Sequence, residues 1–165
     1  MLIFTLVLIA TLVSIVWYTV KLGISPMPSS LKARRAVQEL LPDVRGPVYE
    51  LGAGWGSLLG IMGRYTDVRV YELSPVPFAV AWLRAAKNVK VVRRDFFEVD
   101  LGDAKLVVCY LYPGAMVKLR EKFERELNDC WVISNTFAVP GWKPVKVIVL
   151  DDWYKTRVYL YKRDA

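Results

Sequence analysis

The sequence contains no histidine among its 165 residues and only two cysteines, Cys109 and Cys130. The absence of histidine excludes Ser-His-Asp and Cys-His hydrolases, histidine-ligated metal sites and histidine general-base catalysis. Two cysteines without a neighbouring ligand predict no metal site, and they are too few for a disulfide-stapled miniprotein. We therefore expect two reduced, mostly buried thiols in a reducing compartment.

Charge is absent from the first 20 residues, 16 of which are apolar, and Lys21 is the first charged residue. A helix of this length spans about 30 Å, the thickness of the hydrocarbon core of a bilayer. We predict a transmembrane anchor over residues 1–22, with Trp17 and Tyr18 at headgroup level. A cleaved signal peptide is the alternative, but its basic n-region and Ala-x-Ala site are missing. A buried core helix is the third interpretation.

Basic residues follow this segment and none precedes it. The positive-inside rule therefore predicts a single-pass membrane protein whose remaining chain is cytoplasmic. Pro26 and Pro28 indicate a stiff linker, followed by an amphipathic helix at about 31–41, so that residues 23–42 form a linker and lead-in helix. The basic side of this helix either contacts anionic lipid or is solvated.

Strand-like and helix-like segments alternate from residue 46 onward. Strands are expected at 48–51, 68–73, 89–92, 106–111 and 131–137, and helices at 57–65, 76–86 and 113–127. This alternation predicts an α/β fold over residues 43–165, with a doubly wound, mostly parallel, Rossmann-like sheet. Strands at 145–150 and 157–161 add a terminal antiparallel hairpin. The link after Phe137 is short for a parallel crossover, so it must be extended or the next strand must be offset.

Three strand ends carry the candidate site. The first strand runs into Glu50-Leu51-Gly52-Ala53-Gly54-Trp55-Gly56, where glycines allow positive φ and a close ligand approach, and a following helix offers free N–H groups. Glu72 ends the second strand, where a carboxylate suits the two hydroxyls of a ribose. Asp95 and Phe96 follow the third strand and suit an adenine ring.

The spacing of Gly52, Gly54 and Gly56 after Glu50 differs from the Gly-x-Gly-x-x-Gly of NAD(P) enzymes and resembles motif I of class I S-adenosylmethionine (SAM)-dependent methyltransferases. The resemblance implies SAM as the cofactor. It places the glycine turn against the methionine part, Glu72 at the ribose and Asp95 at the adenine. The implied cofactor-binding set is Glu50, Gly52, Ala53, Gly54, Gly56, Glu72, Leu73, Asp95 and Phe96.

A narrower resemblance extends over nearly the whole chain. Its segments are 107–113 (Val-Val-Cys-Tyr-Leu-Tyr-Pro), 133–137 (Ile-Ser-Asn-Thr-Phe), 140–144 (Pro-Gly-Trp-Lys-Pro) and 155–159 (Lys-Thr-Arg-Val-Tyr). They are similar to small membrane-anchored prokaryotic methyltransferases, which are related to the mitochondrial membrane-associated and archaeal protein-lysine methyltransferases. Two positions differ from those relatives: Trp55 stands where Asp is frequent, and Arg94 where Gly is frequent.

This resemblance implies methyl transfer to lysine side chains of a membrane-associated protein at the cytoplasmic face. An aromatic pocket would desolvate the lysine amine, lower its pKa and bind the cationic product. The candidate catalytic side chains are Tyr110, Tyr112, Phe137 and Trp142. Two alternatives remain: an RNA or DNA methyltransferase, because the net charge is +7, and a membrane-anchored SAM-fold binding module without catalysis.

Overall fold

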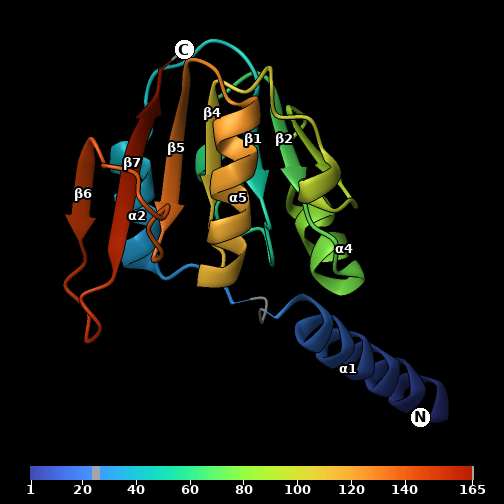
Figure 1. The fold of residues 1–165 in the computed structure, drawn as a ribbon. Coiled ribbons are helices and arrows are strands. Elements are labelled where there is room, and N and C mark those ends of the chain that lie inside the picture. Colours follow the sequence, from blue (N-terminus) through green and yellow to red (C-terminus); the bar gives the residue numbers. More distant parts are fainter. Residues whose placement is uncertain (24–26, 165) are drawn as a thin grey trace.

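The computed structural model describes residues 1–23 and 27–164; Pro26 of the predicted linker lies outside the described residues. Seven strands form one sheet in the order β3-β2-β1-β4-β5-β7-β6 (Figure 1). The strands are β1 (Val48–Leu51), β2 (Val68–Tyr71), β3 (Val89–Val92), β4 (Leu106–Cys109), β5 (Cys130–Asn135), β6 (Lys146–Val149) and β7 (Arg157–Arg163). The first five are parallel, and β7 pairs antiparallel with β5 and β6. The predicted fold class is confirmed.

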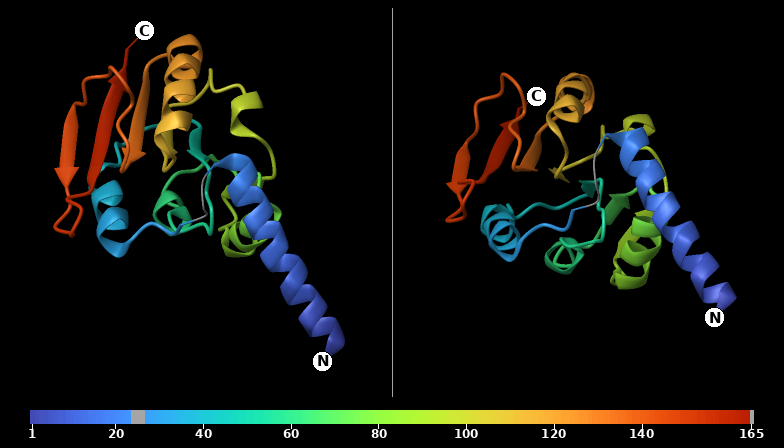
Figure 2. Two further views of the ribbon diagram at one scale, coloured as in Figure 1. Left: turned by 60° about the horizontal axis from the view of Figure 1, so that its bottom comes forward. Right: turned by 90° about the horizontal axis from the view of Figure 1, so that it is seen from below.

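Helices cover both faces of the sheet. They are α1 (Leu2–Leu22), α2 (Leu31–Leu40), α3 (Leu59–Met62), α4 (Pro75–Arg84) and α5 (Pro113–Glu126), with a short 3₁₀ helix η1 (Phe96–Glu98). In the view from below, α5 lies on one face and α2, α3 and α4 lie on the other (Figure 2). The strand order reverses between β1 and β4. Ligands of doubly wound sheets bind outside the carboxyl ends of the strands at such a switch point.

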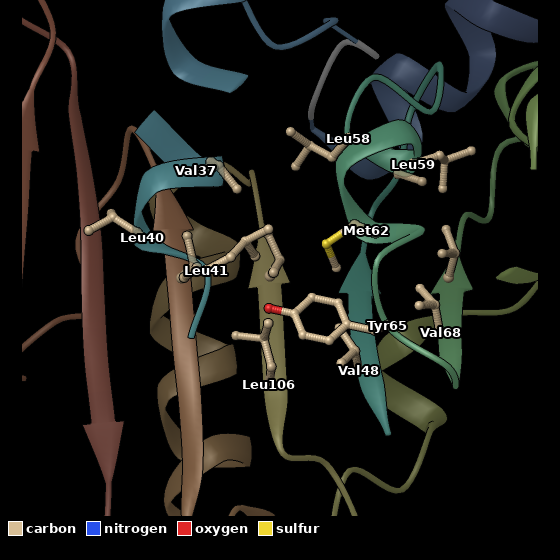
Figure 3. Close-up of a cluster of buried hydrophobic side chains, with 14 of the residues drawn as sticks. Val37, Leu40, Leu41, Val48, Leu58, Leu59, Met62, Tyr65, Val68 and Leu106 are labelled. Carbon is tan, nitrogen blue, oxygen red and sulfur yellow. The ribbon is translucent and has the colours of Figure 1, made fainter. Parts of the chain in front are cut away.

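Period-two alternation along the central strands divides the core into two layers. Val48 and Leu106 face the layer that α2, α3 and α4 contribute to, where they meet Val37, Met62 and other buried side chains (Figure 3). The intervening residues face α5, and Val107 belongs to this second layer. Burial on both faces explains why β1 and β4 are apolar at almost every position.

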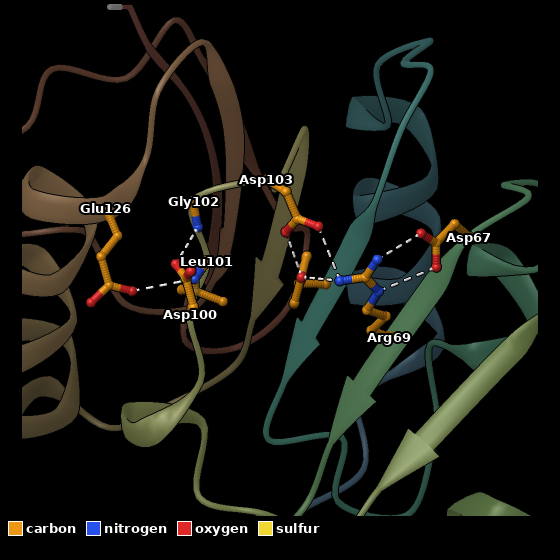
Figure 4. A network of polar contacts seen from close by, with 8 residues as sticks. Asp67, Arg69, Asp100, Leu101, Gly102, Asp103 and Glu126 are labelled. Carbon is orange, nitrogen blue, oxygen red and sulfur yellow. Dashed lines mark hydrogen bonds and ion pairs between the residues drawn. The ribbon is translucent and has the colours of Figure 1, made fainter.

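A polar network joins three strands at the edge where β2 and β4 begin. The Arg69 guanidinium donates to Asp67 and Asp103 at 3.0 and 3.1 Å, and the Tyr49 hydroxyl donates to Asp103 at 2.6 Å (Figure 4). Burial and the adjacent Asp103 raise the pKa of Tyr49 above its ordinary value. This network closes the edge opposite the carboxyl ends, which leaves those ends as the place for a site.

The segments after the glycine turn and after Phe137 refine the expectations from the sequence. The sequence predicts a helix over 57–65, but only the single turn of α3 forms. Gly60 and Gly63 fall within that segment, and glycine destabilises a helix by about 1 kcal/mol relative to alanine. The site therefore has no long helix start behind the glycine turn. The strand after Phe137 is offset, as one of the two alternatives required, because β7 lies between β5 and β6.

Helix α1 is long and apolar enough to cross a membrane, and none of its residues is buried. It ends at Gly23, which takes the left-handed conformation that glycine favours at a helix end (φ 69°). The carboxyl-terminal end of α1 lies at the carboxyl edge of the sheet, and the helix passes beside α4 (Figure 2). The Tyr18 hydroxyl accepts a hydrogen bond from Arg93 at 3.1 Å.

Candidate active site

A cavity of about 500 Å³ opens at the carboxyl edge of the sheet, at the switch point between β1 and β4. Most of the side chains predicted from the sequence line it together. Those residues are Glu50, Gly52, Ala53, Gly54, Glu72, Leu73, Asp95, Phe96, Tyr110, Tyr112 and Phe137. Two predicted residues, Gly56 and Trp142, lie outside it.

Glu72 connects the end of β2 to the glycine turn. One carboxylate oxygen accepts from the Gly54 N–H at 2.8 Å, and the other accepts from the Ser74 N–H at 2.7 Å. Gly52 and Gly54 both have positive φ, 75° and 52°, and no β-carbon obstructs the approach to the turn. Each carboxylate oxygen has a second lone pair, so Glu72 retains the capacity to accept from a ligand.

Glu50 is the most unusual group of the site. The carboxyl lies at the floor of the cavity with an exposed fraction of 3%, and its Oε2 atom has no partner among the described residues. Burial, reinforced by the negative charge of Glu72, raises the pKa of Glu50 to about 8. An unpartnered buried carboxyl is costly, and a cationic ligand group would satisfy it.

Asp95 and the phenylalanines that follow form the side of the cavity next to β3. The Asp95 carboxylate caps η1 by accepting from the Phe97 N–H at 2.9 Å. The Phe96 ring reaches over the glycine turn, where a β-carbon on Gly52 would lie 3.8 Å from it. This corner therefore offers one carboxylate and one aromatic ring to a flat ligand.

The opposite wall is aromatic. Tyr110 and Tyr112 follow β4, and neither hydroxyl makes a hydrogen bond within residues 1–23 and 27–164. Phe137 reaches the cavity through a tight turn in which its N–H donates to the Asn135 carbonyl at 2.9 Å, around Thr136 at φ 73°. Positive φ is strained for a β-branched residue, and such strain concentrates at functional sites.

Trp142 and Gly56 have other surroundings than the sequence predicted. The Trp142 ring packs against Phe123 and Tyr161, and its indole N–H donates to Glu124 at 3.2 Å. It belongs to the α5 layer because the chain after Phe137 turns away from the cavity toward β6. Gly56 is a packing position, where a β-carbon would lie 3.2 Å from the Ala81 backbone.

Several lining residues were not predicted. Lys21, Gly23, Met27 and Ser29 come from the end of α1 and the segment after it, and Lys118 comes from α5. Ser29 is fixed there, because its N–H donates to the Ser57 hydroxyl at 3.1 Å. A β-carbon on Gly23 would touch the Tyr112 ring at 3.6 Å. No motif marks these residues in the sequence, since their contact with the cavity depends on how α1 meets the sheet.

The fold and the site together define a class I SAM-dependent methyltransferase. Acidic groups at the ends of β1 and β2 and after β3 surround a glycine turn at the switch point, where this class binds its cofactor. The residues fit SAM on an observation of this structure: the unpartnered, buried Glu50 carboxyl faces a cavity of ligand size and complements a cation.

Comparison with known proteins agrees with this class. The model of the ANTKMT methyltransferase domain family matches residues 50–146. A protein-lysine N-methyltransferase of Saccharolobus islandicus (strain REY15A) is 31% identical over 124 residues, which cover 69% of this chain and 77% of that protein. A lysine N-methyltransferase of Mus musculus, named for an ATP synthase component, is 29% identical over 125 residues, or 72% of this chain. The aligned part spans only 51% of the mouse protein.

Solved structures show the same fold. An RNA methyltransferase from Salinibacter ruber in complex with S-adenosyl-L-homocysteine superposes with a TM-score of 0.72 at 24% identity, over 84% of this chain and 94% of that one. The ribosomal protein L11 methylase from Lactobacillus delbrueckii subsp. bulgaricus gives 0.64 at 14% identity, over 81% and 78%. The chain belongs to the ANTKMT methyltransferase domain family and is a SAM-dependent methyltransferase.

Proposed function

We propose that this chain is a membrane-anchored protein-lysine methyltransferase that modifies a membrane-associated protein at the cytoplasmic face. Residues 1–22 form the anchor, 23–42 the linker and lead-in helix, and 43–165 the catalytic domain. The observation that carries the proposal is that an acidic wall and an aromatic wall meet in one cavity beside the end of α1.

The acidic wall is assigned to the cofactor. The Glu50 carboxyl suits the amino group of the methionine part, Glu72 suits the ribose hydroxyls, and Asp95 with Phe96 suits the adenine. When bound, SAM supplies an electrophilic methyl group. The protein has to hold this group in line with a neutral nucleophile and to exclude water.

The aromatic wall is assigned to the substrate amine. A lysine amine has an ordinary pKa of about 10.4 and must lose its proton before it can attack. Tyr110, Tyr112 and Phe137 provide an environment that desolvates the ammonium group and lowers its pKa, and their ring faces attract the methylated cation. The names of the Saccharolobus and mouse relatives, both lysine N-methyltransferases, support lysine as the target.

The position of α1 supports a membrane-associated substrate. Lys21 and Gly23, at the end of the predicted anchor, themselves line the cavity. If α1 spans a bilayer, the cavity lies next to the headgroups, and a protein embedded in the same membrane can present a lysine there. The basic residues after α1 place this edge on the cytoplasmic side.

The test is transfer of labelled methyl from SAM into membrane and cytosolic extracts by the purified full chain. Wild type, Glu72→Ala and a control, Glu39→Ala, are compared; Glu39 pairs with Lys146 at the surface and is distant from the cavity in sequence and fold. Each reaction is then split between protease and nuclease. We expect protease-sensitive label in the membrane fraction, recovered as methyl-lysine, that only Glu72→Ala abolishes.

Other outcomes would redirect the proposal. Label removed by nuclease would identify an RNA or DNA methyltransferase. Absence of label, together with absence of SAM binding in calorimetry, would support a non-catalytic binding module. Protease-sensitive label confined to cytosolic proteins would retain the lysine activity but contradict the membrane-associated substrate.

A further inference from the structure

Helix α4 lacks the polar outer face that surface helices normally have. Its sequence, Pro-Val-Pro-Phe-Ala-Val-Ala-Trp-Leu-Arg, holds one charged residue, Arg84, at its last position. Only Pro77 and Ala81 are buried, whereas Trp82 and Leu83 are 60% and 75% exposed. An apolar helix that leaves such side chains in water indicates an additional contact surface.

Helix α5, on the other face of the sheet, provides the contrast. Its outer side carries charges of both signs, including the ion pairs Arg120–Glu124 at 2.8 Å and Lys122–Glu126 at 2.6 Å. That pattern is typical of a helix in contact with water. The two helices cover the same sheet, so the difference belongs to the surroundings of α4 and not to the fold class.

Basic residues surround the exposed apolar side chains. Between Glu72 and Asp95 the chain contains no acidic residue and five basic ones: Arg84, Lys87, Lys90, Arg93 and Arg94. None of the five forms an ion pair within the described part of the chain. Arg84, Lys87 and Lys90 are exposed, next to Trp82 and Leu83. We call Trp82, Leu83, Arg84, Lys87 and Lys90 the α4 patch.

The α4 patch is continuous with α1. The two helices are in contact, and both views of Figure 2 place them side by side. Arg93, which follows β3, donates to the Tyr18 hydroxyl near the end of α1. A bilayer spanned by α1 therefore has its surface within reach of α4.

We propose that the α4 patch docks on the surface of the same bilayer, with Trp82 and Leu83 in the interface and Arg84, Lys87 and Lys90 on anionic headgroups. Apolar side chains ringed by basic ones match this interface, since burial of apolar surface and attraction to anionic lipids add together. This inference rests on the proposed membrane anchor. Leu73 and Ser74, just before α4, line the cavity, so docking would hold the cavity mouth at the lipid surface.

The experiment uses the full chain in vesicles of phosphatidylcholine with phosphatidylglycerol, with and without brominated acyl chains. A fluorophore is attached at Leu83→Cys or, as a control, at Val117→Cys on α5, which is also exposed. The native Cys109 and Cys130 are buried, and burial raises the pKa of each thiol to about 12, so neither competes for the label. Flotation first establishes that the protein is in the membrane.

We expect bromine quenching about threefold or more stronger at residue 83 than at residue 117, because only α4 enters the interface. The variant Lys87→Glu/Lys90→Glu should weaken quenching at residue 83, while flotation through α1 is retained. Equal quenching at both positions in floating protein overturns the inference but leaves the anchor intact. Failure to float overturns the anchor and the inference together.

Two further outcomes identify a different partner. Quenching at residue 83 that disappears as the protein is diluted in excess lipid would mean that a second copy covers the patch. Protection of the residue 83 label by added single-stranded RNA, in the absence of lipid quenching, would mean that the basic residues serve a nucleic acid.

Discussion

The cavity wall formed at the ends of β1 and β2 differs from the wall formed at the ends of β4 and β5 in how its side chains are held. In the first wall, Glu72 is fixed by two backbone N–H groups and the turn is shaped by glycines. In the second, the hydroxyls of Tyr110 and Tyr112 make no hydrogen bond within the described residues, and packing holds the rings. A wall fixed by backbone bonds suits one constant ligand, whereas a packed aromatic wall suits a flexible side chain.

Removal of the Glu72 carboxylate should have the largest effect. In Glu72→Ala, the buried N–H groups of Gly54 and Ser74 lose their acceptor and the ribose loses its partner. At about 1–3 kcal/mol for each unsatisfied group, SAM affinity should fall roughly 100-fold or more. Isothermal titration calorimetry measures this, with Glu98→Ala as an exposed acidic control on η1. A loss within about threefold, on the 1.4 kcal/mol per decade scale, would contradict the assignment.

The pH dependence of SAM binding should report on Glu50. Its pKa of about 8 means that Glu50 is protonated at neutral pH in the free protein, while a cationic ligand favours the ionised form. Binding therefore releases a proton, and affinity should rise as pH rises toward about 8, by at most about tenfold per pH unit. Titrations in buffers of different ionisation enthalpy count the proton. Glu50→Gln should bind more weakly and lose the rise; a rise that persists would exclude Glu50 as its source.

Truncation of the aromatic wall should separate substrate from cofactor. For Tyr110→Ala we expect kcat/KM for a lysine-containing protein substrate to fall by about tenfold, because a ring contact with a desolvated cation contributes about 1–2 kcal/mol. SAM affinity should stay within experimental error of wild type, and Tyr110→Phe should retain most of the activity. Steady-state kinetics with labelled SAM tests this. An equal loss of SAM binding would merge the two walls into one cofactor site.

Trp142→Ala should have the smallest effect on activity. The ring packs on Phe123 and Tyr161 outside the cavity, so its loss should lower the free energy of unfolding by about 2–3 kcal/mol. Denaturant titration measures that change. At a temperature where the variant is fully folded, its kcat/KM should equal that of wild type. A large loss of activity in folded protein would return Trp142 to the substrate wall that the sequence predicts for it.

Most of the acidic wall was predictable, because its residues follow strands at regular positions. Parallel strands bring their carboxyl ends to one edge, so Glu50, Glu72 and Asp95 had to converge once the order of elements was known. The aromatic wall was less predictable. Phe137 reaches the cavity only through the strained turn at Thr136, and Trp142 leaves it because β7 separates β5 from β6.

The sequence by itself determined the alternation of strands and helices, the long uncharged helix α1, and the three acidic strand ends, since periodicity and local spacing dictate these features. Only the tertiary structure decided that Glu50 lacks a partner among the described residues, that Lys21 and Ser29 line the cavity, and that basic residues gather around an exposed apolar helix beside α1. These depend on contacts between segments far apart in the chain. Such contacts follow from the packing of whole elements, which no local pattern encodes.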